Sequence, residues 1–279
     1  MEISYPHTKL SRMREVSGFL LIDKPKGMRS SRLLGELRNS GNIDKAGHAG
    51  TLDTNASGLM IVAINKAVKL FPLFARLDKE YAAEISFHKP VTESDMLRSI
   101  QHFTGKISQL PPRRSAVSRK PRIRSVHRIT LLSFSPRKAS LRISCSAGFY
   151  VRRLASDIGS FLETQAHLSN LRRVKIGSIP VEYALPPGKI SMKNLLSMES
   201  AVEMARVKRI EVLPESIPHI MKGSPVKSRW IVRADHIKKG ETVCVFSESR
   251  LIAVAISYAE TKDFPRMRLA ARTDTVLKQ

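Results

Sequence analysis

The sequence predicts an α+β fold in two units, a larger one that mixes strands and helices and a small β-barrel-like module at the C-terminal end. Residues 79–87 alternate apolar and polar side chains as a half-buried strand does, and residues 92–103 have the apolar spacing of an amphipathic helix. From residue 208 short β-rich pieces dominate, separated by loops that contain Gly223 and Gly240. We therefore expect a basic N-terminal tail (1–16), a larger unit (17–207) and a small module (208–279).

The remaining elements of the larger unit follow from apolar runs and from turn residues. In chain order we expect a buried strand at 18–22, a helix from Ser30–Ser31 to Arg38, a strand over 59–64, a helical stretch over 66–77 that Pro72 interrupts, a hairpin of 131–134 with 140–145, a helix that ends at Leu162, a basic strand within 168–177 and a helix over 193–205.

The composition is that of a folded protein of a reducing compartment. The chain has 279 residues, of which 42% are hydrophobic, and no apolar run approaches the length of a membrane span. The N-terminal tail has no apolar signal core. Cys145 and Cys244 lie far apart and form no metal-ligand spacing, so the sequence indicates a reduced protein of the cytoplasm.

The charge points to a polyanionic partner. Lysine and arginine number 48 against 24 acids, a formal net charge of +24. An anionic membrane surface would require an amphipathic basic helix or a lipidation signal, and neither is found, so nucleic acid is favoured. Residues 113–124 are rich in basic side chains and contain no acid, which favours contact with an RNA backbone through Arg113, Arg114, Arg119, Arg122 and Arg124.

The candidate catalytic group lies in residues 47–58. This stretch holds three glycines, His48 and a single acid, Asp53, and it leads into an apolar run, which predicts a tight loop before a buried strand. A carboxylate held on such a loop is where a catalytic group is expected. The alternative is that Asp53 caps a turn that the glycines shape.

Three further residues have a functional and a structural interpretation. Tyr81 is either a core aromatic with a satisfied hydroxyl or a ring that stacks on a base. Arg152 lies at a strand-to-helix junction, where it is either exposed or pairs with a carboxylate and holds it ionised. Lys24 precedes a turn at Pro25 and Gly27, where it supports the site or meets a phosphate.

Five segments in a fixed order resemble the motifs of the TruB/dyskerin family of RNA pseudouridine synthases: residues 18–27, 47–58, 79–81, 145–159 and 171–173. Segments around 221–226 and 237–243 are similar to a PUA domain, an RNA-binding module. Ala49, Thr54 and Arg29 depart from the family pattern, in which Thr or Ser, Pro and a small hydroxyl residue are usual. Asp53, Tyr81 and Arg152 are retained.

The resemblance implies a mixed, mainly antiparallel sheet in the catalytic domain and isomerisation of uridine to pseudouridine without a cofactor or metal. It implies that Asp53 attacks C1′ or removes a ribose proton, that Arg152 pairs with it, and that Tyr81 stacks on the base and takes the C5 proton. His48 helps to displace the target base or packs the loop. Tyr150 and Leu171 join Lys24 and the five arginines as expected substrate or RNA contacts.

The branch of the family is indicated by residues 87–117. The chain runs directly from Phe87 to the helix expected at Thr92, and Pro111–Pro112 precedes the arginine-rich run, as in the archaeal and eukaryotic dyskerin form. That branch implies tRNA T-loop or rRNA substrates, H/ACA guide RNA and accessory proteins, and a nucleolar location only in a eukaryote. The alternative function is a non-catalytic RNA-binding scaffold or chaperone with the same basic surfaces.

Overall fold

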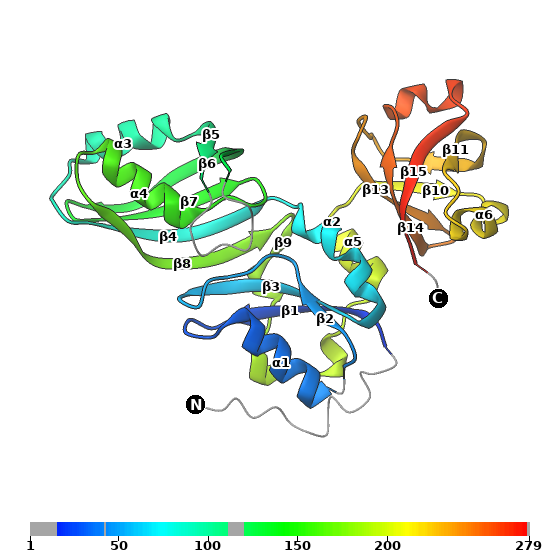
Figure 1. Ribbon diagram of the computed structural model, residues 1–279, viewed down its shortest axis with the longest axis horizontal. Helices are drawn as coiled ribbons and strands as arrows, with labels where there is room; N and C mark the ends of the chain where they lie inside the picture. Colours follow the sequence, from blue (N-terminus) through cyan, green and yellow to red (C-terminus); the bar gives the residue numbers. More distant parts are fainter. Residues whose placement is uncertain (1–15, 42, 111–119, 278–279) are drawn as a thin grey trace.

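The computed structural model describes residues 16–41, 43–110 and 120–277, whose strands form two sheets (Figure 1). The strands of the first sheet are β1 (Gly18–Lys24), β2 (Ala46–His48), β3 (Ala56–Ile64), β4 (Lys79–Phe87), β5 (Gly105–Gln109), β6 (Arg122–Ser135), β7 (Lys138–Cys145), β8 (Ala166–Ile176) and β9 (Ile179–Pro180). The helices are α1 (Ser30–Gly41), α2 (Phe71–Ala75), α3 (Glu93–His102), α4 (Val151–Phe161), α5 (Met198–Met204) and α6 (Ile217–Met221).

The first sheet is mixed and mainly antiparallel, which confirms the predicted fold class. Its order is β1-β3-β8-β4-β7-β6-β5, with β2 beside β3 and β9 beside β8. Among these pairs only β3 and β8 run parallel. Strand β4 has the same bounds as the predicted strand, and its odd-numbered residues from Lys79 to Phe87 are buried.

Strand β3 changes its partner partway along one edge. Strand β8 pairs with residues 56–58 of β3, whereas β2 pairs with residues 62–64. The opposite edge of β3 is paired with β1 along residues 58–64. The loop between β2 and β3, residues 49–55, therefore leaves the sheet at the end of β2 and returns where β3 begins to pair with β8, and this loop contains Asp53.

Apolar side chains cover both faces of the first sheet. Helices α1, α3 and α4 contribute Leu33, Met96 and Ile158 to one cluster, and all three side chains are fully buried. Helices α2 and α5 contribute Phe74 and Val202 to a cluster on the other face. Each fully buried side chain of this size stabilises the fold by about 1.5–3 kcal/mol before the entropic cost of folding.

The second sheet forms the separate lobe in Figure 1. Its order is β11-β15-β14-β13-β10-β12, around a cluster that includes Trp230. Its strands are β10 (Arg209–Val212), β11 (Val226–Lys227), β12 (Ile231–Ala234), β13 (Thr242–Ser247), β14 (Arg250–Ser257) and β15 (Leu269–Val276). The expected boundary at 207/208 falls between α5 and β10.

The two lobes share one hydrophobic cluster. Phe246 and Leu251 of the second sheet belong to the same buried cluster as Ala201 and Val202 of α5. The backbone N–H of Leu251 also donates to Glu199 Oε1 at 3.2 Å. The small C-terminal unit therefore packs on the larger unit through apolar contact and is not held by a linker alone.

One predicted helical stretch is interrupted near Pro72 as expected, and one predicted helix is wrong in detail. Residues 66–77 form a 3₁₀ segment, Asn65–Leu70, followed by α2, and Pro72 lies in the first turn of α2, where a missing N–H costs no helical hydrogen bond. Residues 193–205 are divided because the Ser197 hydroxyl accepts from Ser200 N at 3.0 Å and caps α5, which begins only at Met198.

Other predictions differ at their ends or lie outside the described residues. Strand β3 already begins at Ala56 and His48 belongs to β2, so the tight loop is shorter than expected. Strand β6 extends back to Arg122, which places Arg122 and Arg124 on a strand. Arg113, Arg114, Arg119 and residues 1–15 of the expected tail lie outside the described residues.

Lys79 makes stability depend on pH. Its ammonium group is buried and donates to the carbonyls of Ala75 and Leu77, and burial lowers the pKa of Lys79 to about 8. An unfolded lysine titrates near 10.4, so between about pH 8 and pH 10 the unfolded chain binds more protons than the folded one. We expect the free energy of unfolding, measured in urea, to rise over this range, and Lys79→Met to remove much of the rise. The exposed Lys106→Met is the control and retains it; an unchanged rise in Lys79→Met would contradict the prediction.

Gly58 is required where β3 pairs with β8, opposite Arg173. Its φ is +106° and a Cβ there would lie 2.2 Å from the backbone oxygen of Arg173. Gly58→Ala should lower the free energy of unfolding by roughly 1–3 kcal/mol, because both the conformation and the contact are strained. Gly35→Ala is the matched control, since no atom lies within 4 Å of its Cβ position inside α1, and it should stabilise by roughly 0.5–1 kcal/mol. Equal effects of the two substitutions in urea unfolding would rule out this explanation.

Candidate active site

Asp53 and Arg152 form an ion pair between two distant parts of the chain. Asp53 lies on the loop before β3, and Arg152 lies in the first turn of α4. Nη2 of Arg152 contacts Oδ2 of Asp53, and the side chains are 54% and 51% exposed, respectively. The turn itself is closed by a backbone hydrogen bond from Ala56 N to Asp53 O at 3.0 Å. The carboxylate is therefore presented at the surface, in contact with a guanidinium group.

The residues on either side of Asp53 are fixed by the connection between β1 and α1. The Ser30 hydroxyl donates to Leu52 O at 2.9 Å and accepts from Leu52 N at 3.3 Å, and Leu52 is buried. Gly27 N donates to Thr54 O at 2.8 Å. Ser30 was expected to begin α1 as a capping residue, but the described hydrogen bonds of its hydroxyl go to this loop. The Asp53 backbone is thus anchored before and after the carboxylate.

Lys24 supports this loop from inside the protein. Its Nζ donates to Met28 O at 2.7 Å and to Pro25 O at 2.9 Å, and it lies 3.5 Å from Thr54 O. Burial lowers the pKa of Lys24, while the Asp53 carboxylate acts in the opposite direction. The side chain has no exposed surface, so the structure favours the supporting role and not the phosphate contact.

Tyr81 and Leu171 lie on neighbouring strands of the sheet and belong to one apolar cluster. Tyr81 is on β4 and Leu171 on β8, each side chain is 9% exposed, and both belong to the cluster that contains Leu52. Burial raises the pKa of Tyr81, and the positive charge of Arg173 opposes that rise. Asp53 is close enough to affect the titration of Tyr81 as well. The expected catalytic residues Asp53, Tyr81 and Arg152 are therefore brought to one region.

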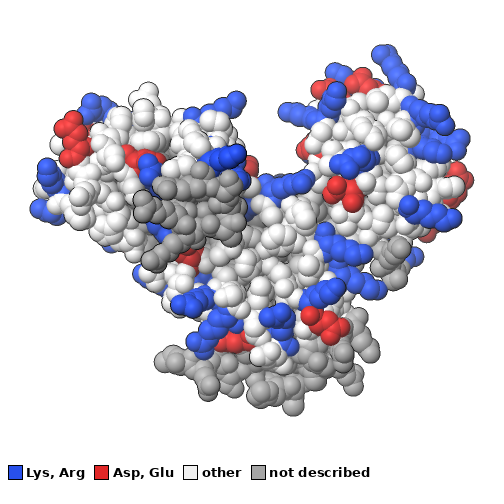
Figure 2. All heavy atoms as spheres, viewed as in Figure 1, with Lys and Arg blue, Asp and Glu red and all other residues white. Residues whose placement is uncertain are grey.

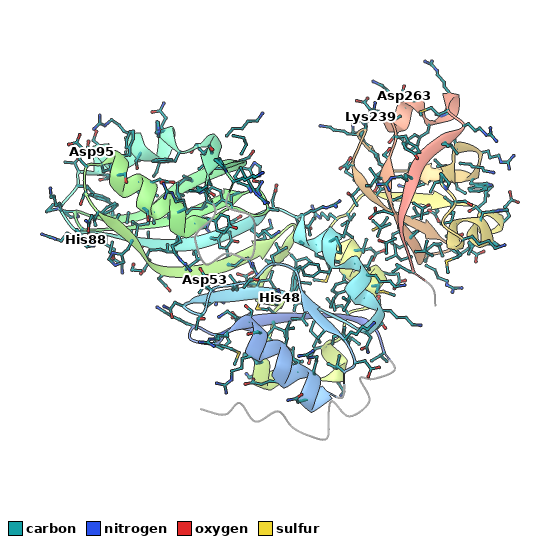
Figure 3. All side chains as sticks on the ribbon, in the orientation of Figure 1. His48, Asp53, His88, Asp95, Lys239 and Asp263 are labelled. Atoms are coloured by element: carbon teal, nitrogen blue, oxygen red, sulfur yellow. The ribbon has the colours of Figure 1, made fainter. Side chains whose placement is uncertain are left out.

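His48 lies on β2, at the start of the loop that carries Asp53 (Figure 3). Its Nδ1 is buried and has no hydrogen-bond partner among the described residues. Burial lowers the pKa of His48, which favours the neutral imidazole. Both the packing role and the base-displacing role are compatible with this position, so the role of His48 stays a prediction.

Gln109 fixes the helix start that presents Arg152. Its Oε1 accepts from Tyr150 N at 2.9 Å, and its Nε2 donates to Tyr150 O at 3.2 Å. The Gln109 side chain is 1% exposed. Nearby, Arg124 Nε donates to Gly148 O at 3.2 Å. Tyr150 is therefore held through its backbone, two residues before Arg152.

Several residues of this region were missed by the sequence analysis. Gln109 and Ser30 carry no sequence signal for their long-range bonds. Asp23 pairs bidentately with Arg172 at 2.9 and 2.7 Å, which ties β1 to β8. Arg173 is 2% exposed, although an arginine is expected at the surface. Only the family motif at residues 171–173 marked the strand as important.

The face shown in Figure 2 carries lysine and arginine on both lobes, with fewer acids between them. This agrees with the overall charge of +24. Of the helices in the described part of the chain, none has the length and apolar character needed to cross a bilayer.

Comparison with known proteins identifies relatives of this chain. The model of the TruB family pseudouridylate synthase N-terminal domain matches residues 38–151, which include Asp53 and Tyr81. A protein of Methanocaldococcus jannaschii named probable tRNA pseudouridine synthase B is 33% identical over 261 residues, covering 88% of this chain and 78% of the relative. A Nanoarchaeum equitans protein of the same name is 31% identical over 259 residues, covering 87% and 74%.

Solved structures share the fold over nearly the whole chain. A chain in the crystal structure of a Cbf5–Nop10–Gar1 complex matches with a TM-score of 0.86 and 27% identity, covering 99% of this chain and 89% of that one. A chain in the archaeal box H/ACA sRNP Nop10–Cbf5 complex matches with a TM-score of 0.83 and 25% identity, covering 98% and 90%. The chain belongs to the TruB family and is an RNA pseudouridine synthase, an enzyme that isomerises uridine to pseudouridine.

Proposed function

We propose that this protein modifies uridine in the T loop of tRNA, and in rRNA as the catalytic subunit of an H/ACA guide ribonucleoprotein, with Asp53 as the catalytic carboxylate. The ion pair of Asp53 and Arg152 on an anchored loop carries the proposal. The names of the archaeal relatives support tRNA as a substrate. The similarity to chains that assemble with Nop10 and Gar1 supports a guided complex with accessory proteins.

The reaction breaks the N1–C1′ bond of uridine, rotates the base and joins C5 to C1′. Asp53 acts on the ribose, either by attacking C1′ or by removing a ribose proton, and both roles need an ionised carboxylate. The pair is half exposed without RNA, so water screens it. When RNA covers the site, water is displaced, the ion pair strengthens, and Arg152 keeps the carboxylate charged.

The target base would lie against Tyr81 and Leu171. Both side chains are almost fully buried in the apolar cluster that also contains Leu52 of the loop, and a flipped base would stack against the small part that is exposed. His48, at the start of the loop, assists displacement of the base or packs the loop. Lys24 and Ser30 hold the loop and do not meet the substrate.

The RNA backbone would be bound outside this centre. Arg122 and Arg124 are on β6 near the Arg152 helix, and Arg113, Arg114 and Arg119 precede them in the chain. The second sheet acts as a PUA domain, packed on the catalytic domain at α5. Residues 1–16 add positive charge, and we place the protein inside the cell, in the cytoplasm or, in a eukaryote, the nucleolus.

Asp53→Asn tests the proposed chemistry. It should lower pseudouridine formation by roughly 10²–10⁴-fold or more, because the amide neither attacks C1′ nor accepts a ribose proton. The assay maps pseudouridine in an unmodified tRNA transcript, with the protein alone and with guide RNA and accessory proteins added. Affinity for RNA, measured at one stated salt concentration, should persist.

Asp263→Asn, a substitution in the second lobe, is the control and should retain full activity (Figure 3). Retained activity in Asp53→Asn would exclude Asp53 as the catalytic carboxylate. Absence of product from the native protein with every addition would leave the RNA-binding scaffold or chaperone.

Arg122 and Arg124 can be tested through salt dependence. Each phosphate contact contributes to the slope of log K against log salt, so Arg122→Ala and Arg124→Ala should each reduce that slope by about 1. Arg98→Ala removes an exposed arginine that pairs with Asp95 on α3, and it should leave the slope unchanged. A slope unaffected by the β6 substitutions would remove these residues from the RNA interface.

A further inference from the structure

Helix α4 begins without the groups that usually stabilise the start of a helix. Its N-cap residue is Tyr150, whose side chain makes no capping hydrogen bond with the residues that the structure describes. The first turn, residues 151–154, contains Arg152 and Arg153 and no acid, although the positive end of the helix dipole disfavours cations there. In a capping box, the third helical residue accepts the N–H of the N-cap, but Arg153 has no acceptor atom. The helix start that presents Arg152 is therefore not stabilised by its own sequence.

Gln109 supplies the missing partner from a distant strand. It is the last residue of β5, at the edge of the first sheet, and it is the buried one of the five residues of that strand. Its Oε1 accepts from Tyr150 N at 2.9 Å, as the third residue of a capping box would, and its Nε2 donates to Tyr150 O at 3.2 Å. One side-chain amide thus holds both backbone polar groups of the N-cap residue.

The turn that leads into α4 is held at its other end by β6. Ser146 N donates to Ser125 O at 2.9 Å, and Ser125 N donates to Ser146 Oγ at 3.0 Å. Further along the turn, Arg124 Nε donates to Gly148 O at 3.2 Å. Gln109 is therefore the last, in chain order, of a series of contacts that fix this turn to β5 and β6 before α4 begins.

The carboxylate of the ion pair is fixed by a different part of the fold. Asp53 lies on the loop that Ser30 and Gly27 hold from the connection between β1 and α1. Arg152 reaches this loop from α4, and both side chains are half exposed. Because an exposed ion pair is weak, it does not by itself fix the position of either partner. The geometry of the pair depends on the backbone contacts on each side.

We infer that Gln109 is a positioning residue of the reaction, which caps α4 from β5 and thereby places the Arg152 guanidinium group against the Asp53 carboxylate. This inference rests on the proposed roles of Asp53 and Arg152. The hydrogen bonds of the Gln109 side chain go to the Tyr150 backbone and not to the ion pair, so it acts through the start of the helix. A displacement of about 1 Å that originates far from the chemistry can slow a reaction about 10²-fold.

Gln109→Met tests this role, because it keeps the length of the side chain and removes both hydrogen bonds. We expect the single-turnover rate of pseudouridine formation to fall roughly 10–100-fold. The Kd for the tRNA transcript, measured at one stated salt concentration, should stay within about twofold of the native value. A native single-turnover rate in Gln109→Met would overturn the inference.

Thr92→Ala is the matched control, because Thr92 caps the start of another helix, α3, which carries no residue of the site. Its Oγ1 accepts from Asp95 N at 3.1 Å. Loss of this cap should lower the midpoint of thermal unfolding and leave the single-turnover rate at the native value. An equal loss of rate in Thr92→Ala and Gln109→Met would mean that any weakened helix start slows the reaction, and it would overturn the inference.

A double-mutant cycle shows whether Gln109 acts through Arg152. Single-turnover rates are measured for the native protein, Gln109→Met, Arg152→Met and the double variant. Without the guanidinium group there is nothing left to position, so Gln109→Met should slow the Arg152→Met protein by no more than about twofold. Effects that multiply would overturn the inference. Gln109→Asn keeps the amide on a side chain one carbon shorter, and it replaces Gln109→Met in the cycle if that variant does not fold.

Tyr150→Ala separates this role from an RNA contact of the Tyr150 ring. The backbone groups that Gln109 binds are kept in Tyr150→Ala, so Gln109→Met should slow this variant as much as it slows the native protein. If the effect disappears, Gln109 acts through the Tyr150 ring and the inference fails. A native rate in Arg152→Met would overturn the proposed role of the ion pair as well. A slow Arg152→Met with a native Gln109→Met would overturn the inference alone.

Discussion

The structure depends on the change of partner along one edge of β3. Strand β8 pairs with the start of β3 and β2 pairs with its end, so the loop between β2 and β3 emerges from inside the sheet and not from its rim. A loop in that place can be anchored on several sides, and Ser30, Gly27 and Arg173 supply the anchors. The backbone of Asp53 is consequently held on both sides, and its carboxylate is left at the surface.

Positive charge is arranged in two layers around this loop. Lys24 and Arg173 are buried beneath it and bind backbone carbonyls, whereas Arg152 is half exposed and binds the carboxylate. Burying these two cations costs solvation free energy, and burial lowers the pKa of both groups. The exposed ion pair of Arg152 with Asp53 is weak in water but strengthens when RNA excludes water. The site is therefore best suited to a negatively charged substrate that covers it.

The second lobe is joined to the first by the cluster that contains Phe246 and Val202. Polar contacts surround it, including Arg76 Nη1 to Thr242 Oγ1 at 3.2 Å and Lys69 Nζ to Val276 O at 3.4 Å. A unit of this size has a small core of its own, so the shared cluster adds to its stability.

The sequence by itself determined the strands with clear alternation, such as β4, the two-unit organisation, and Asp53 as the one acid of a glycine-rich loop. These features depend on neighbours along the chain, and local pattern and backbone preference suffice to find them. The interruption near Pro72 was predicted because proline is a clear breaker, whereas the start of α5 was misjudged because a single serine, Ser197, caps it. The family resemblance already implied that Asp53 meets Arg152, whereas only the tertiary structure decided that Gln109 holds Tyr150 and that Lys24 and Arg173 are buried. Each of these depends on strands that are distant in sequence, and an arginine inside a sheet has no sequence signal that distinguishes it from one at the surface.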